Sequence, residues 1–235
     1  MNKLLEIKNL KVVLDNHIIH NKLSFSINEG SIVTILGPNG SGKSVLLKAI
    51  LGILPYEGEI IWYKKATIGY LPQGLNQQAV KDMPLTVKDI FDIKEPTHNE
   101  EEIIVSLKLV GLDVDILSKN AYTLSGGQFQ RMLIAWVLID KPQVLFLDEP
   151  ASGVDIGGGE NLYSLLHKLQ QTENLTILLV THDISIVYKY SNNVLCLSQK
   201  KHLCFGEPKT ILTPQLLEQM FGMEIKFYDH PTNNL

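Results

Sequence analysis

The sequence predicts an α/β protein with a mostly parallel central sheet, and three observations support this class. Short apolar runs rich in β-branched residues recur along the chain, as in Ile32–Leu36 and Leu175–Val180. Segments with helical spacing of apolar residues separate these runs, as between Asn161 and Leu169. Buried strands that alternate with helices are typical of a parallel sheet covered on both faces.

The individual elements follow from the same two periodicities. The expected strands are residues 5–8, 11–14, 25–28, 32–36, 59–63, 67–71, 144–147, 175–180 and 194–197. The expected helices are residues 44–51, 100–109, 128–139, 161–169, 184–190 and 214–221.

Composition excludes several classes of protein. The 235 residues suffice for one large domain, and 45% of them are apolar, which is ordinary for a globular core. A formal charge of −4 argues against a nucleic-acid partner, which calls for a basic surface. The N-terminus meets Lys3 and Glu6 too soon for a signal peptide. No run reaches the roughly 20 apolar residues of a membrane span, so we expect any membrane role to depend on a partner.

The two cysteines carry no motif. Cys196 and Cys204 do not fit the spacing of a metal site. We expect two free thiols in a reducing cytosol.

A glycine-rich loop carries the strongest chemical signal. It fits the pattern G-x-x-x-x-G-K-[ST] and lies between a predicted strand and a predicted helix. Glycines let successive N–H groups converge on phosphate oxygens, and the helix start adds its positive dipole end. The lysine adds a charge for the β- and γ-phosphates, and the final hydroxyl can ligate Mg²⁺. The loop residues are Gly37, Pro38, Asn39, Gly40, Ser41, Gly42, Lys43 and Ser44.

A second motif places two carboxylates at the end of a buried strand. Asp148 and Glu149 follow the apolar run 144–147. Strands of such sheets deliver their carboxyl ends to the ligand crevice. We therefore expect Asp148 to hold Mg²⁺, and Glu149 to act as the general base on the water that attacks the γ-phosphate.

A third motif determines the family. Leu124-Ser125-Gly126-Gly127-Gln128 opens the predicted helix 128–139, with Ser125 as a favourable N-cap and two glycines that expose N–H groups. Taken in this order, the three motifs resemble the ATP-binding-cassette ATPases, and residues 124–128 match the signature loop of that family. There the loop binds the γ-phosphate of ATP held by a second subunit. The resemblance therefore implies a homodimer with two ATP molecules at its interface.

The resemblance extends over nearly the whole chain and implies the fold in detail. It predicts a P-loop NTPase core with a mostly parallel sheet, an N-terminal antiparallel β subdomain and an inserted α-helical subdomain. We expect one domain over residues 1–225, with the core in 1–74 and 140–225 and the helical subdomain in about 75–139. A polar tail, 226–235, follows.

Other positions also match family residues. Gln73 resembles the glutamine that touches Mg²⁺ and senses the attacking water, and His182 matches the switch histidine that hydrogen-bonds the γ-phosphate and fixes Glu149. Asp155 would contact the opposite subunit, or would simply cap the helix that follows. Leu14 departs from the pattern, because the family usually has an aromatic residue there that stacks on adenine. Leucine can cover the base with apolar surface but cannot stack on it.

Within the family, the chain is most similar to the ATPase subunits of bacterial zinc importers. The short stretch 57–73 and the segments 82–87 and 194–221 carry this likeness. It implies a cytoplasmic subunit on the inner face of the cell membrane that drives integral membrane permease subunits. A periplasmic or surface metal-binding protein would be an indirect partner. The open alternatives are an importer of manganese or iron, and a soluble cassette ATPase of iron–sulfur cluster assembly.

Overall fold

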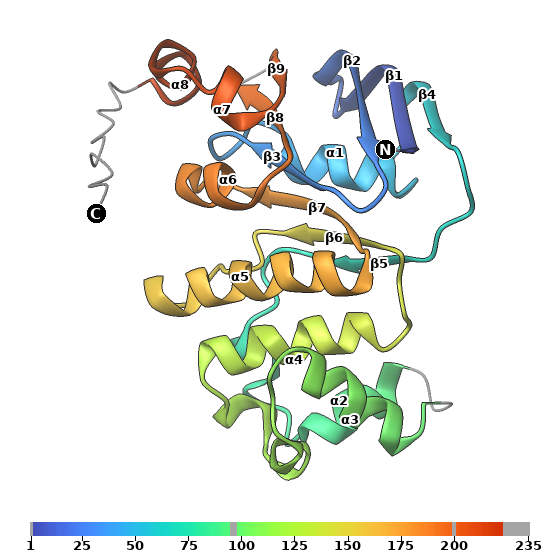
Figure 1. Cartoon of the computed structure of the whole chain (residues 1–235), viewed down its shortest axis with the longest axis vertical. Coiled ribbons are helices and arrows are strands. Elements are labelled where there is room, and N and C mark those ends of the chain that lie inside the picture. The colour runs from blue at the N-terminus through green and yellow to red at the C-terminus, as the bar shows by residue number, and fades with distance from the viewer. Residues whose placement is uncertain (1, 95–97, 199–200, 223–235) are drawn as a thin grey trace, which may run out of the picture.

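A six-stranded sheet forms the centre of the molecule, and a three-stranded sheet lies beside it (Figure 1). The computed structural model describes residues 2–94, 98–198 and 201–222. The strands are β1 Lys3–Leu14, β2 His17–Asn28, β3 Ile32–Leu36, β4 Glu57–Trp62, β5 Ile68–Leu71, β6 Val144–Asp148, β7 Thr176–Thr181, β8 Asn193–Ser198 and β9 Lys201–Gly206. The helices are α1 Lys43–Ile50, α2 Val87–Lys94, α3 Glu100–Leu109, α4 Gly126–Leu138, α5 Ile156–Glu173, α6 Ile184–Tyr190, α7 Pro208–Ile211 and α8 Pro214–Phe221, with 3₁₀ turns η1 Gln77–Val80, η2 Val114–Ser118 and η3 Ala121–Thr123.

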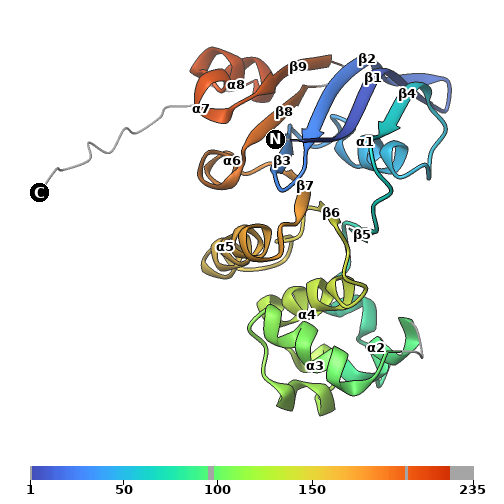
Figure 2. The same cartoon turned by 45° about the vertical axis from the view of Figure 1, so that its right-hand side comes forward.

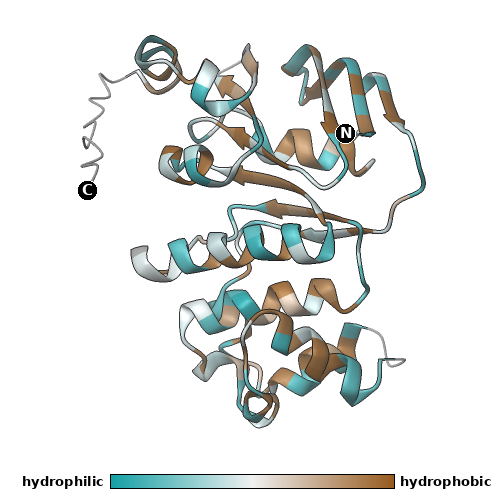
Figure 3. Ribbon diagram, in the orientation of Figure 1, coloured by the Kyte–Doolittle hydropathy of each residue, from teal (hydrophilic) through white to brown (hydrophobic). Residues whose placement is uncertain are grey.

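The large sheet is parallel except at one edge. Its order is β5-β6-β7-β3-β8-β9, and only β9 runs antiparallel to its neighbour. Every residue of β3, β6 and β7 is buried, which explains why their sequences are continuous apolar runs rather than alternating ones. Figure 3 shows these central strands as mostly hydrophobic, with hydrophilic residues on the helices around them.

Hydrophobic cores cover both faces of this sheet, and a smaller cluster lies under α6 and α8. One core joins α1 and the strands β1 and β2 to the sheet. The other joins α5 and α4 to the opposite face, and it includes Leu162, Leu166 and Leu169 from the apolar stripe of α5. Figure 2 shows the small sheet β2-β1-β4 on the far side of the large sheet from α5. The predicted fold class, with its antiparallel N-terminal sheet, is confirmed.

In its described residues, the segment between β5 and β6 consists of helices and 3₁₀ turns joined by short loops. Helix α4 packs against α5 and β5, and α2 and α3 lie beyond α4, farther from the large sheet (Figure 2). Helix α3 starts with a capping box, in which Asn99 and Glu102 each accept a hydrogen bond from the backbone N–H of the other. Helix α4 supplies much of the shared core through Phe129, Met132 and Leu133.

The structure differs from the sequence-based expectations in several places. It contains α2 and α7 where no helix was expected, and β2 begins at His17 rather than at residue 25. The two strands expected in residues 5–14 are one strand, β1, with irregular pairing around Asn9, whose φ is 51°. Helix α5 begins at Ile156 and runs through three consecutive glycines that the helical pattern does not predict. The expected free thiols are wrong, because Cys196 and Cys204 form a disulfide between opposed positions of β8 and β9. The predicted polar tail, 226–235, lies outside the described residues.

None of the helices that the structure describes combines the length and the apolar character needed to cross a membrane. This agrees with the absence of a long apolar run in the sequence.

Candidate functional site

The glycine-rich loop connects β3 to α1 in a conformation that requires glycine. Gly42 immediately precedes α1 with φ 91°, in the left-handed region that L side chains rarely adopt. A Cβ atom on Gly42 would come within 2.7 Å of Ile19 and 2.9 Å of the His20 ring. A Cβ on Gly37 would lie 2.4 Å from the carbonyl oxygen of Leu197. The loop is therefore packed so closely on β2 and β8 that only glycine fits these positions.

Lys43 is buried at the start of α1 and points into the loop. Its Nζ donates to the carbonyls of Gly37 at 2.9 Å and Pro38 at 3.1 Å. The same nitrogen lies 3.8 Å from Oε1 of Glu149. Burial lowers the pKa of Lys43, and the charges of Glu149 and Asp148 oppose that shift. These partners hold the Lys43 ammonium group in place. An anionic ligand could take over from the two carbonyls as its hydrogen-bond acceptor.

Asp148 ends β6, and its buried carboxylate has one oxygen without a hydrogen-bond partner in the part of the chain that the structure describes. The residue is 2% exposed, and its Oδ1 has no hydrogen-bond partner among the described residues. Burial raises the pKa of Asp148, and a hydrogen bond with the Ser44 side chain works against that rise. A buried oxygen of this kind is available to a cation or to a hydrogen-bond donor such as water.

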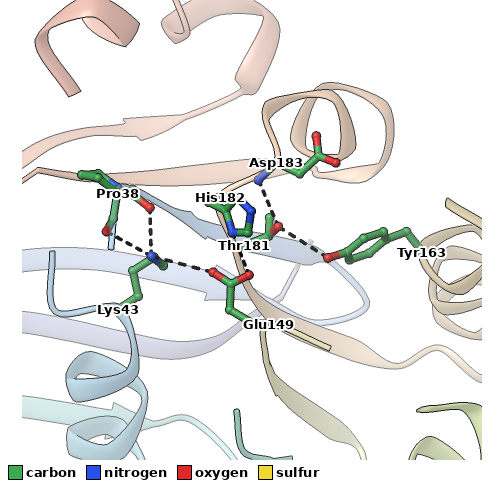
Figure 4. Close-up of polar contacts among 8 residues, drawn as sticks. Pro38, Lys43, Glu149, Tyr163, Thr181, His182 and Asp183 are labelled. Carbon is green, nitrogen blue, oxygen red and sulfur yellow. Dashed lines mark hydrogen bonds and ion pairs between the residues drawn. The ribbon is translucent and has the colours of Figure 1, made fainter. Parts of the chain in front are cut away.

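Glu149 follows in a strained conformation between two basic groups. Its φ of 52° is left-handed, which costs about 1–3 kcal/mol for a residue other than glycine. Its N–H donates to the carbonyl of Val180 at 3.1 Å, which fixes the chain beside β7. Oε2 lies 2.9 Å from Nδ1 of His182, so that Lys43 and His182 approach the carboxylate from two sides (Figure 4).

His182 is held by the turn between β7 and α6. The Thr181 hydroxyl accepts from the N–H of Asp183 at 3.1 Å, and the Tyr163 hydroxyl donates to it at 3.4 Å (Figure 4). Asp183 caps α6 by accepting from Ser185 N–H at 2.8 Å. The carboxylate of Glu149 can only accept, so Nδ1 of His182 is the donor. The imidazole is 66% exposed, so the remainder of the ring reaches the open side of the site.

A cleft of about 340 Å³ brings eight of the predicted residues together, and His182 borders it through Glu149 without lining it. Its lining residues are Ile19, Asn39, Gly40, Gly42, Lys43, Ser44, Val45, Gln73, Asp148 and Glu149. Leu14, at the end of β1, is not among them, and the apolar part of the wall comes from Ile19 and Val45 instead. Sequence reasoning missed Ile19, because no motif marks a residue of a neighbouring strand.

The third motif lies at a different hollow. Ser125 caps α4 in a capping box, accepting from Gln128 N–H at 3.2 Å while Gln128 Oε1 accepts from Ser125 N–H at 3.0 Å. The expected N-cap is thus confirmed. The hollow, of about 660 Å³, is lined by Ser125, Gly126, Gly127, Gln128, Arg131, Gly153, Asp155, Gly157, Gly158 and Asn161. It shares no lining residue with the first cleft.

Asp155 lies at the N-cap position of α5 but makes no side-chain cap hydrogen bond. Its carboxylate lines the second hollow, beside Gly158. Asp155 therefore occupies the position of an N-cap but does not make the hydrogen bond that defines a side-chain cap.

Two glutamine side chains connect the segment after Gln73 to the segment around Ser125. Gln130, buried on α4, donates from Nε2 to the carbonyl of Leu75 at 3.1 Å. In the reverse direction, Gln77 on η1 donates to the carbonyl of Leu124. The residues that follow the first cleft are thereby attached to the residues that open the second hollow.

The residues at the cleft fit Mg²⁺ better than a transition metal. No group of three or more His, Cys, Asp or Glu side chains that could enclose a metal occurs in the parts of the chain that the structure describes. The available donors are oxygens, those of Ser44, Gln73 and the unpartnered Asp148. Mg²⁺ prefers one or two protein oxygens together with phosphate and water.

Comparisons with known proteins agree with this arrangement. Residues 20–152 match a family model described as ABC transporter. The chain is 38% identical to the zinc import ATP-binding protein ZnuC of Histophilus somni, over 98% of this chain and 88% of that protein. It is 37% identical to ZnuC of Wigglesworthia glossinidia brevipalpis, over 94% of each.

Solved structures show the same fold. A chain of a metal-chelate type ABC transporter in an inward-facing conformation aligns with a TM-score of 0.84 and 31% identity, covering 95% of this chain and 90% of that one. The cbiO1 subunit of Clostridium perfringens, part of the transporter complex cbiONQ, aligns with a TM-score of 0.79 and 26% identity, covering 93% and 94%.

The burial of Asp148 leads to a stability prediction. A raised carboxyl pKa means that the folded state disfavours the ionised form, and this penalty is complete above the folded pKa. Asp148→Asn should therefore raise the free energy of unfolding at pH 7 by about 0.5–2 kcal/mol in nucleotide-free protein. Urea denaturation measures the gain, which should vanish as the pH falls below the unfolded-state value of about 3.9. The exposed control Asp113→Asn should change little, and a destabilised Asp148→Asn protein would contradict the prediction.

Proposed function

The chain belongs to the ABC transporter family, and from this premise we propose that it is the ATP-hydrolysing subunit of an importer for a divalent metal ion, with zinc as the ion. One observation carries the catalytic part of the proposal. A buried carboxylate, Glu149, stands 2.9 Å from His182 and 3.8 Å from Lys43 at the mouth of a phosphate-binding loop. The names of the curated relatives support zinc as the transported ion.

In the proposed mechanism, the loop N–H groups and Lys43 bind the phosphates of ATP. The triphosphate replaces the carbonyls of Gly37 and Pro38 as the partner of Lys43 Nζ. Ser44, Gln73 and Asp148 hold Mg²⁺, which supplies positive charge against the β- and γ-phosphates when it is bound. The adenine ring would be covered by apolar contact with Ile19, which lines the cleft, and with Leu14, which lies outside its lining at the end of β1, rather than by stacking.

The hydrolytic step is assigned to Glu149. Its carboxylate takes a proton from water as the water oxygen bonds to the γ-phosphorus, and the bond from that phosphorus to the ADP oxygen breaks. His182 holds the carboxylate through Nδ1 and presents its exposed ring to the γ-phosphate. The left-handed backbone of Glu149 turns the carboxylate towards the cleft while Asp148 stays in the strand.

A second copy of the chain completes each site in this proposal. The hollow of Ser125, Gly126, Gly127 and Gln128 is separate from the cleft of Lys43. In a head-to-tail pair, the N–H groups at the start of α4 in one copy would face the γ-phosphate held by the other. Asp155, in the same hollow without a cap hydrogen bond, would contact the partner copy.

Closing and reopening of this pair would drive transport. We assign the work to permease subunits in the membrane, with this chain as a peripheral subunit on their cytoplasmic side and a surface or periplasmic protein that delivers the metal. The helical region, about 75–139, would carry the motion, since Gln73 leads into it. A manganese or iron importer and a soluble ATPase of iron–sulfur cluster assembly are the alternatives.

Replacement of Glu149 tests the general base. Glu149→Gln keeps the shape and a hydrogen-bond acceptor for His182 but cannot take up a proton, so the turnover rate should fall by about 10²–10⁴-fold. ATP binding should be retained, and the pair should persist in the ATP-bound form. Phosphate release measures turnover, and light scattering measures the dimer. The exposed control Glu101→Gln should leave both unchanged, while a Glu149→Gln rate within about tenfold of wild type would eliminate Glu149 as the base.

A mixture of two inactive chains tests the shared site. Ser125→Arg blocks the signature hollow, and Lys43→Ala disables the phosphate loop, so each variant alone should be inactive. A mixed pair holds one intact site, formed by the wild-type Lys43 of one chain and the wild-type Ser125 of the other. An equal mixture should therefore recover up to about a quarter of the wild-type rate, because half of the pairs are mixed. A mixture as inactive as its components would argue that each site lies within one chain.

Capture from native membranes tests the transport role. The tagged chain, purified in mild detergent, should bring down an integral membrane protein in roughly equal amount. Cells without the chain should accumulate less zinc at low external zinc, and a Lys43→Ala copy should fail to restore uptake. Selective loss of manganese or iron uptake instead would identify a different ion. A soluble partner with unchanged metal uptake would favour cluster assembly over transport.

A further inference from the structure

His20 is a buried histidine that the proposed mechanism does not use. It lies on β2, where it pairs with Val12 of β1, and it is 5% exposed. Neither the three motifs nor the resemblance points to it, because it belongs to the small sheet rather than to the parallel core. Its side chain nevertheless reaches the phosphate loop.

The contact is a hydrogen bond to the loop backbone. Nε2 of His20 lies 2.9 Å from the carbonyl oxygen of Gly42. A carbonyl can only accept, so Nε2 carries the proton and donates. The same oxygen accepts the N–H of Leu46 at 2.9 Å, the first hydrogen bond of α1. The Gly42 carbonyl is thus held by one donor from its own helix and one from the neighbouring sheet.

This hydrogen bond determines the direction of a phosphate-binding group. The peptide unit is planar and trans, so the carbonyl of Gly42 and the N–H of Lys43 point in opposite directions. Lys43 is the first residue of α1, and its N–H therefore has no acceptor within the helix. With the carbonyl of Gly42 turned towards His20, this free N–H is directed away from the imidazole.

Glycine makes such a restraint necessary. Gly42 has a φ of 91°, and glycine can exchange this conformation for others at little steric cost. The Gly42–Lys43 peptide could therefore rotate in the absence of a ligand. The imidazole opposes that rotation both by its hydrogen bond and by packing, since its Cε1 and Nε2 would be 2.9 Å from a Cβ atom at Gly42.

We propose that His20 is a positioning residue for nucleotide binding, which holds the Gly42–Lys43 peptide so that the Lys43 N–H faces the phosphates. The imidazole itself touches neither nucleotide nor Mg²⁺. Its effect is preorganisation, because the loop does not have to be ordered when the phosphates arrive. The inference rests on the proposed nucleotide site at this loop and is independent of the transported ion.

A matched pair of substitutions separates the hydrogen bond from packing. His20→Gln and His20→Met place side chains of nearly the same shape at the site, and only glutamine has a donor, at a reach from Cβ similar to that of Nε2. ADP serves as the probe because it occupies the phosphate loop without being hydrolysed. Calorimetric titration of the purified full chain gives its dissociation constant, and thermal melting without nucleotide checks the fold.

The expected results differ for the two variants. His20→Met should bind ADP about three- to tenfold more weakly than wild type, the effect of one hydrogen bond, whereas His20→Gln should stay within about twofold. Equal ADP affinities of the two variants would overturn the role of the donor. If the Met variant does not fold, His20→Asn, whose shorter amide falls short of Gly42, replaces it in the comparison with His20→Gln. A wild-type chain that fails to bind ADP would reject the nucleotide site itself, which distinguishes the two failures.

Discussion

The parallel register of β3, β6 and β7 is the constraint on which the site depends. Leu36 at the end of β3 pairs with Thr181, and Asp148 at the end of β6 pairs with Val180. The three strands therefore end at the same edge of the sheet, where their following residues meet. A one-residue slip of β6 would turn Asp148 to the other face and remove it from Ser44. Complete burial of all three strands makes such a slip costly.

At that edge, the protein gathers charges that stabilise one another only in part. Lys43 approaches Glu149 within 3.8 Å, while Asp148 keeps an oxygen without a hydrogen-bond partner in the described structure. Burial shifts the pKa of Lys43 downwards and that of Asp148 upwards, which in each case disfavours the charged form. The strained backbone of Glu149 adds to this cost. A ligand that carries both negative phosphates and a cation would offset the cost of burying Lys43 and Asp148 at the same time.

The sequence predicted the parallel core well, because β-branched apolar runs have few other interpretations. Helices α3, α6 and α8 were placed residue for residue, with α3 identified by its apolar spacing. The start of α5 was missed, since three glycines oppose a helix locally and only packing on the sheet compensates for them. The Cys196–Cys204 disulfide was missed because its two positions come together only through the pairing of β8 with β9.

The candidate site was predictable where the chemistry follows from local spacing. The cleft collects Lys43, Ser44, Asp148 and Glu149, which two motifs predicted, and Gln73, which only the resemblance supplied. The contacts of Ile19 and His20 could not be predicted, because they depend on how the small sheet packs against the loop. The division into core and helical subdomain, and the assignment of a role to each site residue, remain predictions.

The two glutamine bonds between the Leu75–Gln77 segment and the Leu124–Gln130 segment have a consequence for the behaviour of a pair. In the proposed head-to-tail arrangement, the first segment follows the nucleotide of its own chain, and the second faces the nucleotide of the other. Occupancy of one site would then alter the affinity of its counterpart, and by linkage the effect is reciprocal. If the coupling is positive, the ATP dependence is sigmoidal, with a Hill coefficient between one and about two, the number of sites.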